Sequence, residues 1–248
     1  PYREGHALWT LDLYVPEIPP AGGPRPAIVF VHGGGWRQGD KGAILFRNLS
    51  VHFAQKGFAC FSVNYRLTPQ AAFPAAVIDV KCAVRWLRAH AGRYVVDTDR
   101  IGAMGSSAGG HLTAMLALAG PEAGFDDEGP WRDYSSAVQA AVPLCAPTDF
   151  TAVMQPGDTT EPDAYHAFLA GHRESLTERQ RAASPLFYVT PKTPPFLIVH
   201  GTADPVVPVD QADRLVAALD SAGADVTYLR KEGAEHAVYI ERQAEVEP

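Results

Sequence analysis

The stretch Arg100-Ile101-Gly102-Ala103-Met104-Gly105-Ser106-Ser107-Ala108-Gly109 decides how this chain is expected to fold. Its first five residues favour a strand, and residues 111–118, just after it, have the apolar composition of a buried helix. Residues 105–109 match the G-x-S-x-G pattern, in which a serine stands on a tight turn between a strand and a helix. The glycines allow neighbouring backbone to approach where a Cβ would collide. The pattern therefore predicts a strained turn that presents Ser107.

Predicted strands and helices alternate along the rest of the chain. The expected strands span residues 8–15, 27–31, 58–63, 137–144, 196–199 and 226–229. The expected helices span residues 75–88 and 208–222, where apolar residues recur at helical spacing. Such alternation is typical of an α/β fold, whose mostly parallel central sheet is flanked by helices on both faces. Ligands of such sheets gather at the carboxyl ends of the strands.

The length of the chain suits one large domain, so residues 1–248 are predicted to form a single domain. Residues 151–184 interrupt two predicted strands with Pro156-Gly157, with the aromatic residues Tyr165 and Phe168, and with a charged run. This segment is expected to be a short lid insertion; the alternative is a solvated excursion that never contacts substrate. Residues 120–133 are acidic and rich in glycine and proline, so they are expected to form a surface loop.

Composition and charge argue against several classes of protein. The formal net charge of −7 argues against a nucleic-acid partner, because phosphate binding needs a basic surface. No apolar run approaches the roughly 18–20 residues that a membrane-spanning helix needs. Cys60, Cys82 and Cys145 lie in apolar runs without zinc-binding spacing, so reduced core residues are expected. No motif for a metal or a cofactor appears, and neither is expected.

The first residue is Pro1 rather than methionine, which is expected if a signal peptide has been removed or the chain has been trimmed. The expected location is therefore cytoplasmic or secreted, with the cytoplasm favoured. Nothing in the sequence specifies an oligomeric state.

A serine hydroxyl becomes a good nucleophile only when a base takes its proton and a carboxylate orients that base. Asp204 directly follows the strand predicted at 196–199, and His236 lies in a turn after the last predicted strand. The chain order Ser107, Asp204, His236 is the order of a hydrolase triad built on an α/β sheet. We therefore expect Ser107 as nucleophile, Asp204 as acid and His236 as base.

Other acidic residues and histidines compete for these roles. Asp149 also follows a predicted strand, but a structural role in a turn is preferred for it, and Asp210 is less well placed. Among the histidines, His32 is expected to hold its own loop by hydrogen bonds. A buried structural place is expected for His111 and for His200, and Glu235 is expected to be solvated.

The segment His32-Gly33-Gly34-Gly35-Trp36 follows a predicted strand and matches the glycine-rich loop of lipases and esterases. Attack on an ester carbonyl creates an oxyanion, which needs preorganised hydrogen-bond donors. The backbone N–H groups of Gly34, Gly35 and Ala108 are expected to form this oxyanion hole. Trp36 is expected either to line the acyl pocket or to pack in the core.

On these residues the chain resembles the α/β-hydrolase-fold carboxylesterases, in particular the bacterial feruloyl and acetyl-xylan esterase-like proteins, which are related to the hormone-sensitive-lipase-like esterases. The resemblance covers most of the chain. It rests on five segments, which are residues 32–36, 64–67, 73–79, 105–109 and 200–208. It implies the same triad and the same oxyanion donors.

The resemblance implies a serine carboxylesterase that hydrolyses short acyl esters, of acetyl or feruloyl type, through an acyl-enzyme. Its partner would be an ester of a small molecule or of a polysaccharide. Two alternatives stay open at this stage. One is an amidase or formamidase, since relatives of this kind share the scaffold, and the other is a non-catalytic binding protein of the hydrolase fold.

Overall fold

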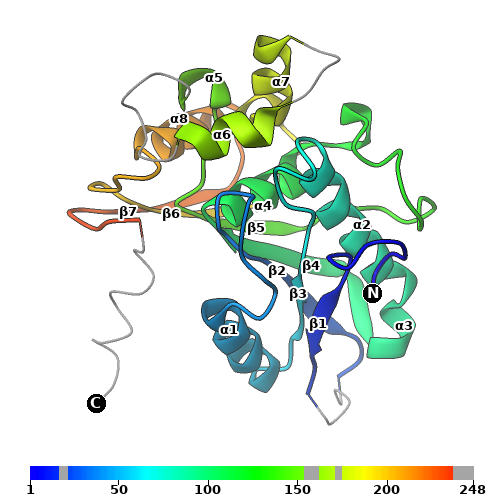
Figure 1. The fold of residues 1–248 in the computed structure, drawn as a ribbon. Coiled ribbons are helices and arrows are strands. Elements are labelled where there is room, and N and C mark those ends of the chain that lie inside the picture. The colour runs from blue at the N-terminus through cyan, green and yellow to red at the C-terminus, as the bar shows by residue number, and fades with distance from the viewer. Residues whose placement is uncertain (17–21, 154–161, 171–174, 237–248) are drawn as a thin grey trace.

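The computed structural model describes residues 1–16, 22–153, 162–170 and 175–236. Seven strands form one sheet in the order β1-β3-β2-β4-β5-β6-β7 (Figure 1). β1 pairs antiparallel with β3, and every other pair is parallel. The strands are β1 Leu11–Tyr14, β2 Arg25–Val31, β3 Ala59–Val63, β4 Val96–Ser106, β5 Ala140–Leu144, β6 Phe196–Gly201 and β7 Val226–Lys231. The mostly parallel sheet expected from the alternation is confirmed.

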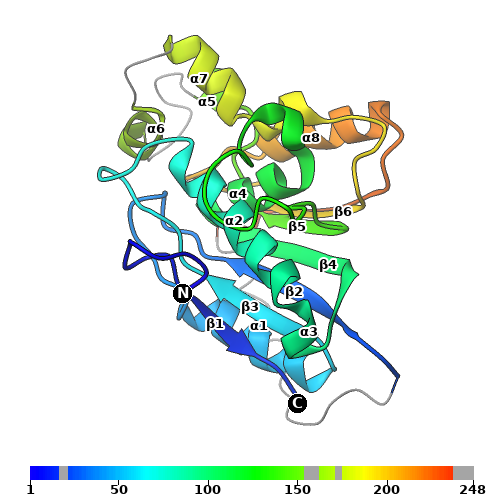
Figure 2. The ribbon, with the colours of Figure 1, turned by 90° about the vertical axis from the view of Figure 1, so that its right-hand side faces the viewer.

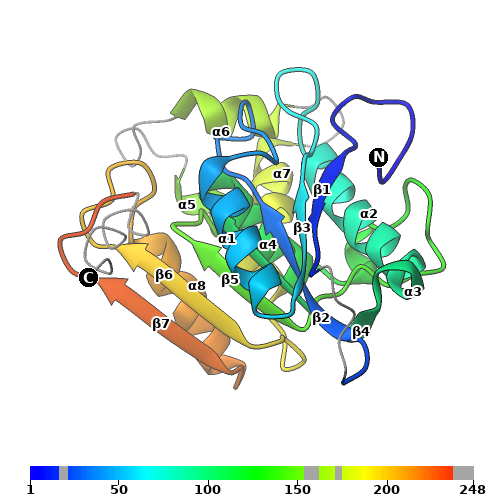
Figure 3. The same cartoon turned by 90° about the horizontal axis from the view of Figure 1, so that it is seen from below.

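Helices cover both faces of this sheet, as expected. The described helices are α1 Ile44–Gln55, α2 Ala75–Ala89, α3 Ala91–Tyr94, α4 Ala108–Leu118, α5 Phe150–Val153, α6 Pro162–Leu169, α7 Leu176–Ala183 and α8 Asp210–Ser221, with short 3₁₀ turns at Pro121–Ala123 and Pro185–Tyr188. Seen from below, α1 lies in front of the sheet, while α4 and α8 lie behind it (Figure 3).

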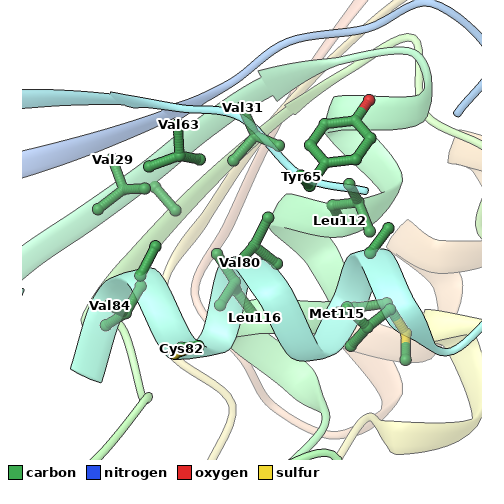
Figure 4. Packing of buried hydrophobic residues seen from close by; sticks show 14 of the residues in the cluster. Val29, Val31, Val63, Tyr65, Val80, Cys82, Val84, Leu112, Met115 and Leu116 are labelled. Atoms are coloured by element: carbon green, nitrogen blue, oxygen red, sulfur yellow. The ribbon is translucent and has the colours of Figure 1, made fainter. Parts of the chain in front are cut away.

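Alternating side chains of the central strands divide the core between the two faces. Val29 and Val31 of β2 pack with α2 and α4, whereas Phe30 of the same strand packs with Phe46 of α1. Figure 4 shows the larger cluster, in which Val80 of α2 points towards the strands and Met115 of α4 lies among the helices. Because a central parallel strand is buried on both faces, its apolar run is continuous rather than alternating. Nearly every residue of helix α4 is buried, and a helix that is buried on all sides is apolar all round.

Several features differ from the sequence-based expectation. Helices α1 and α3 were not predicted, although Leu45, Leu49 and Phe53 of α1 recur at helical spacing and pack beside the buried Phe46. Residues 120–133 do form a loop, but it is anchored rather than solvated throughout, because Phe125 is buried and Lys81 Nζ of α2 donates to Asp126 Oδ2 at 2.9 Å.

The segment between β5 and β6 carries α5, α6 and α7, and α6 and α7 lie together at the top of the molecule (Figure 2). Tyr165 and Phe168 of α6 are buried against Trp36. The described part of the expected lid, residues 151–184, is therefore mostly helical, and its helix α6 packs on the glycine-rich loop. Residues 154–161 and 171–174, which include Pro156-Gly157, lie outside the described residues. That the segment acts as a lid stays a prediction.

Candidate active site

Ser107 stands alone between β4, which ends at Ser106, and α4, which begins at Ala108. Its backbone lies at φ 55° and ψ −122°, a conformation that few non-glycine residues adopt and that costs about 1–3 kcal/mol. Two hydrogen bonds hold it there: its N–H donates to the Leu144 carbonyl at 2.8 Å, and its own carbonyl accepts from the His111 N–H at 2.9 Å. The strained turn expected from the sequence is present.

The two glycines of the motif are required by close contacts rather than by their own φ angles. A Cβ on Gly105 would collide with the carbonyl of Gly109, and a Cβ on Gly109 would collide with the carbonyl oxygen of Val31 at the end of β2. The start of α4 therefore lies against both β4 and β2. This contact brings Ser107 next to the loop that follows β2.

The loop after β2 is held by its histidine and by a tyrosine. The ring of His32 stacks on Tyr65 with centroids 4.3 Å apart, its Nδ1 lies 2.8 Å from the Gly33 carbonyl, and the Tyr65 hydroxyl donates to the His32 carbonyl. Burial lowers the pKa of His32, so its ring is neutral and donates from Nδ1. The expected loop-holding role of His32 agrees with these contacts. Gly34 and Gly35 both have positive φ, at 113° and 59°.

Asp204 and His236 form a direct pair across the ends of β6 and β7. His236 Nδ1 lies 2.7 Å from Asp204 Oδ2, and the Asp204 side chain is fully buried. Asp204 Oδ1 accepts the N–H groups of Val206 and Val207, each at 2.8 Å. Burial alone would raise the pKa of Asp204, but hydrogen bonds from His200, His236 and the Val207 amide hold that pKa well below its ordinary value. The carboxylate is therefore ionised.

A cavity of about 440 Å³ opens over these groups. Ser107 and His236 both line it, together with Gly34, Gly35 and Val207. Within the described residues, no hydrogen bond joins Ser107 Oγ to the His236 ring. In enzymes such contacts often tighten only when substrate is bound. Ala108 is the first residue of α4, so its N–H has no carbonyl of its own helix to bond.

Trp36 packs in the core and also lines the cavity, so both expected positions apply to it, and most of its side chain is in packing contacts. Its side chain is buried, stacks on Phe168 with centroids 4.3 Å apart and donates from Nε1 to His111 Nδ1 at 3.2 Å, yet it also borders the cavity. The structure thus gives Trp36 a wall position beneath α6. A role in binding substrate stays a prediction.

The competing residues have structural partners. Asp149 Oδ1 accepts from the N–H and the hydroxyl of Thr151, and Asp149 Oδ2 faces Arg214 at 3.3 Å. His111 is fully buried between Trp36 and the Ala183 carbonyl, and burial lowers its pKa to about 4. Glu235 is exposed, as expected. Asp210 begins α8 and pairs with Arg214.

Sequence reasoning missed a third partner of Asp204. His200, the penultimate residue of β6, is fully buried, and its Nε2 lies 2.9 Å from the Val207 carbonyl and 3.2 Å from Asp204 Oδ2. Because a carbonyl and a carboxylate both accept, Nε2 carries the proton. The spacing of four residues between His200 and Asp204 was visible in the sequence, but a histidine in a strand gave no sign that it faces the acid.

Comparisons with known proteins agree on a family. Residues 11–219 match the family model BD-FAE. Esterase LipQ of Mycobacterium tuberculosis is 33% identical over 96% of this chain and 56% of its own length. The ethyl acetate hydrolase of Pseudomonas putida is 36% identical over 46% of this chain and 36% of its own length. The chain spans about half the length of the first curated relatives that it matches.

Solved structures of esterases share the fold over nearly the whole chain. A truncated carbohydrate esterase from gut microbiota superposes with a TM-score of 0.79 at 29% identity, covering 95% of this chain and 86% of that one. Butyrate-bound Est2 of the planctomycete Thermogutta terrifontis gives a TM-score of 0.77 at 30% identity, covering 92% and 80%. None of the described helices is both long and apolar enough to span a bilayer.

Proposed function

Because this chain belongs to the BD-FAE family of α/β hydrolases, we propose that it is a serine carboxylesterase acting on short acyl esters. One observation carries the proposal. The strained Ser107, the hydrogen-bonded pair His236–Asp204 and the glycine-rich loop all meet at a single cavity. A nucleophile, an oriented base and a set of backbone donors are what acyl transfer requires.

In the proposed first step His236 Nε2 takes the proton of Ser107 Oγ while that oxygen forms a bond to the carbonyl carbon. The negative charge that develops on the carbonyl oxygen is met by the N–H groups of Gly34, Gly35 and Ala108. The carbon–oxygen bond to the alcohol then breaks, and the leaving oxygen takes the proton from His236. Water, deprotonated by His236, releases the acid from Ser107 in the second step.

Asp204 supports both steps through its charge and its position. It accepts the Nδ1 proton of His236 at 2.7 Å, which leaves Nε2 free to act as the base. When His236 becomes positively charged, the buried carboxylate stabilises that charge strongly, since water does not screen it. Two backbone N–H groups and His200 keep the carboxylate ionised and fixed in place.

Short acyl groups, of acetyl or feruloyl type, are proposed as the part of the substrate that enters the cavity. The volume of about 440 Å³ lies near the low end of ligand pockets. The relatives support the same range, since Est2 has been solved with butyrate and with propionate, and one relative is an ethyl acetate hydrolase. The gut carbohydrate esterase supports an alcohol that is a sugar.

Ser107→Ala tests the reaction, with Ser106→Ala as its neighbouring control. We expect Ser107→Ala to lose hydrolysis of p-nitrophenyl acetate and labelling by a fluorophosphonate, because both need the same oxygen. Ser106→Ala should keep labelling. Turnover that survives in Ser107→Ala would contradict the proposal.

A substrate panel tests the specificity. Nitrophenyl esters of increasing acyl length, methyl ferulate, acetylated xylan and N-formylkynurenine are compared by kcat/KM. We expect the acetyl to butyryl esters to lead. A preference for N-formylkynurenine would favour a formamidase.

A further inference from the structure

The acid and the base of the candidate site share their surroundings with a cysteine that the proposed reaction does not use. Within the part of the chain that the structure describes, Cys145 Sγ, a carboxylate oxygen of Asp204 and a ring nitrogen of His236 all lie within 4.8 Å of one another. The three residues follow β5, β6 and β7, which are neighbours in the sheet. A thiol, an imidazole and a carboxylate, each from the segment after one of three neighbouring strands, thus lie close together.

The position of Cys145 is imposed by its backbone. Its φ of 47° lies in the left-handed region, where a non-glycine residue is uncommon, and its N–H donates to the Val199 carbonyl of β6 at 2.9 Å. Cys145 is buried and is not in a disulfide. From this position the Cys145 sulfur lies within 4.8 Å of the ligand atoms of Asp204 and His236.

We propose that Cys145, Asp204 and His236 form a binding site for a divalent zinc-like ion, and that this ion reversibly blocks the active site. The blocking effect rests on the proposed esterase function, whereas the binding does not. Thiolate sulfur, imidazole nitrogen and carboxylate oxygen are the three ligand types that Zn²⁺ takes in proteins. In a tetrahedral site such atoms lie about 3.5 Å apart. To hold the ion, the 2.7 Å contact between His236 Nδ1 and Asp204 Oδ2 opens, while the longer separations within the group, of up to 4.8 Å, shorten.

Charge and surroundings suit a dication. A thiolate and a carboxylate together neutralise Zn²⁺, while the ring of His236 adds a neutral ligand. The carboxylate is held by the Val206 and Val207 amides and by His200, as the outer partners of metal ligands hold them in known sites. His236 lines the open cavity and its side chain is 23% exposed, so an ion reaches the site from solvent.

Binding changes the protons of the site in a defined way. The thiol of Cys145 loses its proton to solvent as the sulfur–metal bond forms. The metal takes the place of the proton on His236 Nδ1, and the neutral ring then carries its proton on Nε2. With Nε2 protonated, His236 cannot accept the proton of Ser107. An occupied site is therefore an inactive one.

Binding is tested first, and without any reference to catalysis. Co²⁺ is added to the protein as a spectroscopic probe, and Zn²⁺ affinity is measured by competition with a chromophoric chelator. We expect a thiolate-to-cobalt charge-transfer band that Cys145→Ser removes, together with a loss of at least about tenfold in Zn²⁺ affinity. Cys60→Ser and Cys82→Ser replace the other two buried cysteines and should keep the band.

An unchanged band or affinity in Cys145→Ser would overturn the site, and so would loss of the band in either control. Thermal unfolding confirms that each variant is folded, and Cys145→Ala provides a second replacement if the serine variant is not. The result decides the binding site even if the chain proves to hydrolyse no ester.

Inhibition is tested second. For each protein, the rate of p-nitrophenyl acetate hydrolysis in Zn²⁺ is divided by the rate of the same protein in chelator. We expect this ratio to fall below about one tenth in the wild type and the half-inhibiting Zn²⁺ concentration to rise at least about tenfold in Cys145→Ser. Equal half-inhibiting concentrations in both proteins, or activation by Zn²⁺, would overturn the proposed block. Activity that persists in Ser107→Ala would instead refute the esterase mechanism.

Discussion

Asp79 and Asp204 are both carboxylates with fully buried side chains, but they differ in the donors that surround them. Asp79, on α2, accepts from the guanidinium and the backbone N–H of Arg66 and from the indole of Trp9. Asp204 accepts from two imidazoles and two backbone amides. The first carboxylate has a permanent cation beside it, and the second has no arginine or lysine among these donors.

In the proposed reaction, this difference separates a structural carboxylate, Asp79, from one that takes part in the chemistry, Asp204. The charge of Asp79 is cancelled at all times by Arg66, so Asp79 ties the segment after β3 to α2 and has no charge left to act on a reaction. No permanent cation stands among the donors to Asp204 named above, so in the proposed reaction its charge is available to the proton that His236 takes from Ser107.

The largest expected effect concerns Asp204. Asp204→Asn should lower kcat by about 10⁴-fold, because the amide favours the wrong tautomer of His236 and removes the charge that stabilises its protonated form. Thermal unfolding and kcat for a nitrophenyl ester are measured together, with Asp149→Asn as the matched control after the neighbouring strand. Loss of activity in Asp149→Asn with retention in Asp204→Asn would move the acid to Asp149.

The reverse result is expected at Asp79. Asp79→Asn should lower the free energy of unfolding by about 3 kcal/mol, since it leaves the partly buried cation of Arg66 without its counter-ion. The folded fraction should keep kcat within a few-fold. Urea unfolding and active-site titration with a fluorophosphonate separate the two quantities. A kcat that collapses in a fully stable Asp79→Asn would break the distinction between the two carboxylates.

His111 extends the comparison to the pH dependence of stability. It is a buried imidazole whose Nε2 lies against the Ala183 carbonyl instead of a carboxylate. Burial lowers the pKa of His111 to about 4 from 6.5, so the folded state holds this ring neutral while the unfolded state takes up a proton. The neutral ring of His111 therefore makes its full contribution to the free energy of unfolding above pH 6.5. That contribution, about 3 kcal/mol, is lost as the pH falls towards 4.

His111→Gln should flatten that decline, measured as the free energy of unfolding between pH 7 and about 4. His52→Gln, at an exposed position of α1, is the control and should leave the slope as in the wild type. An equal slope in His111→Gln would show that other groups cause the acid sensitivity.

The smallest effect is expected at His200, a positioning residue that touches Asp204 rather than substrate. His200→Phe keeps a ring of similar shape but removes one of the donors to Asp204, so kcat should fall about tenfold while KM stays constant. Kinetics and thermal unfolding are compared for the same preparation. A lower unfolding temperature with unchanged kcat would make His200 a purely structural residue.

Much of this molecule is specified locally by its sequence. The glycines of residues 105–109, the apolar runs on either side and the glycine-rich loop after β2 predicted the parallel α/β architecture and the turn that presents Ser107. These predictions worked because steric limits at a turn and burial on both faces of a strand act over a few residues. Helix α1 was missed although Leu45, Leu49 and Phe53 recur at helical spacing, so the local signal for it was present in the sequence.

Contacts between distant segments were decided by the tertiary structure alone. Asp149 and Asp204 both follow strands, and only the fold directs Asp149 to Arg214 and Asp204 to His236. The contact of Trp36 with α6, the support from His200 and the approach of Cys145 are likewise invisible along the chain. The sequence by itself determined which residues stand at the carboxyl ends of the strands. The order of the strands in the sheet determined which of those residues meet, because side chains at the ends of neighbouring strands become neighbours whatever their separation in sequence.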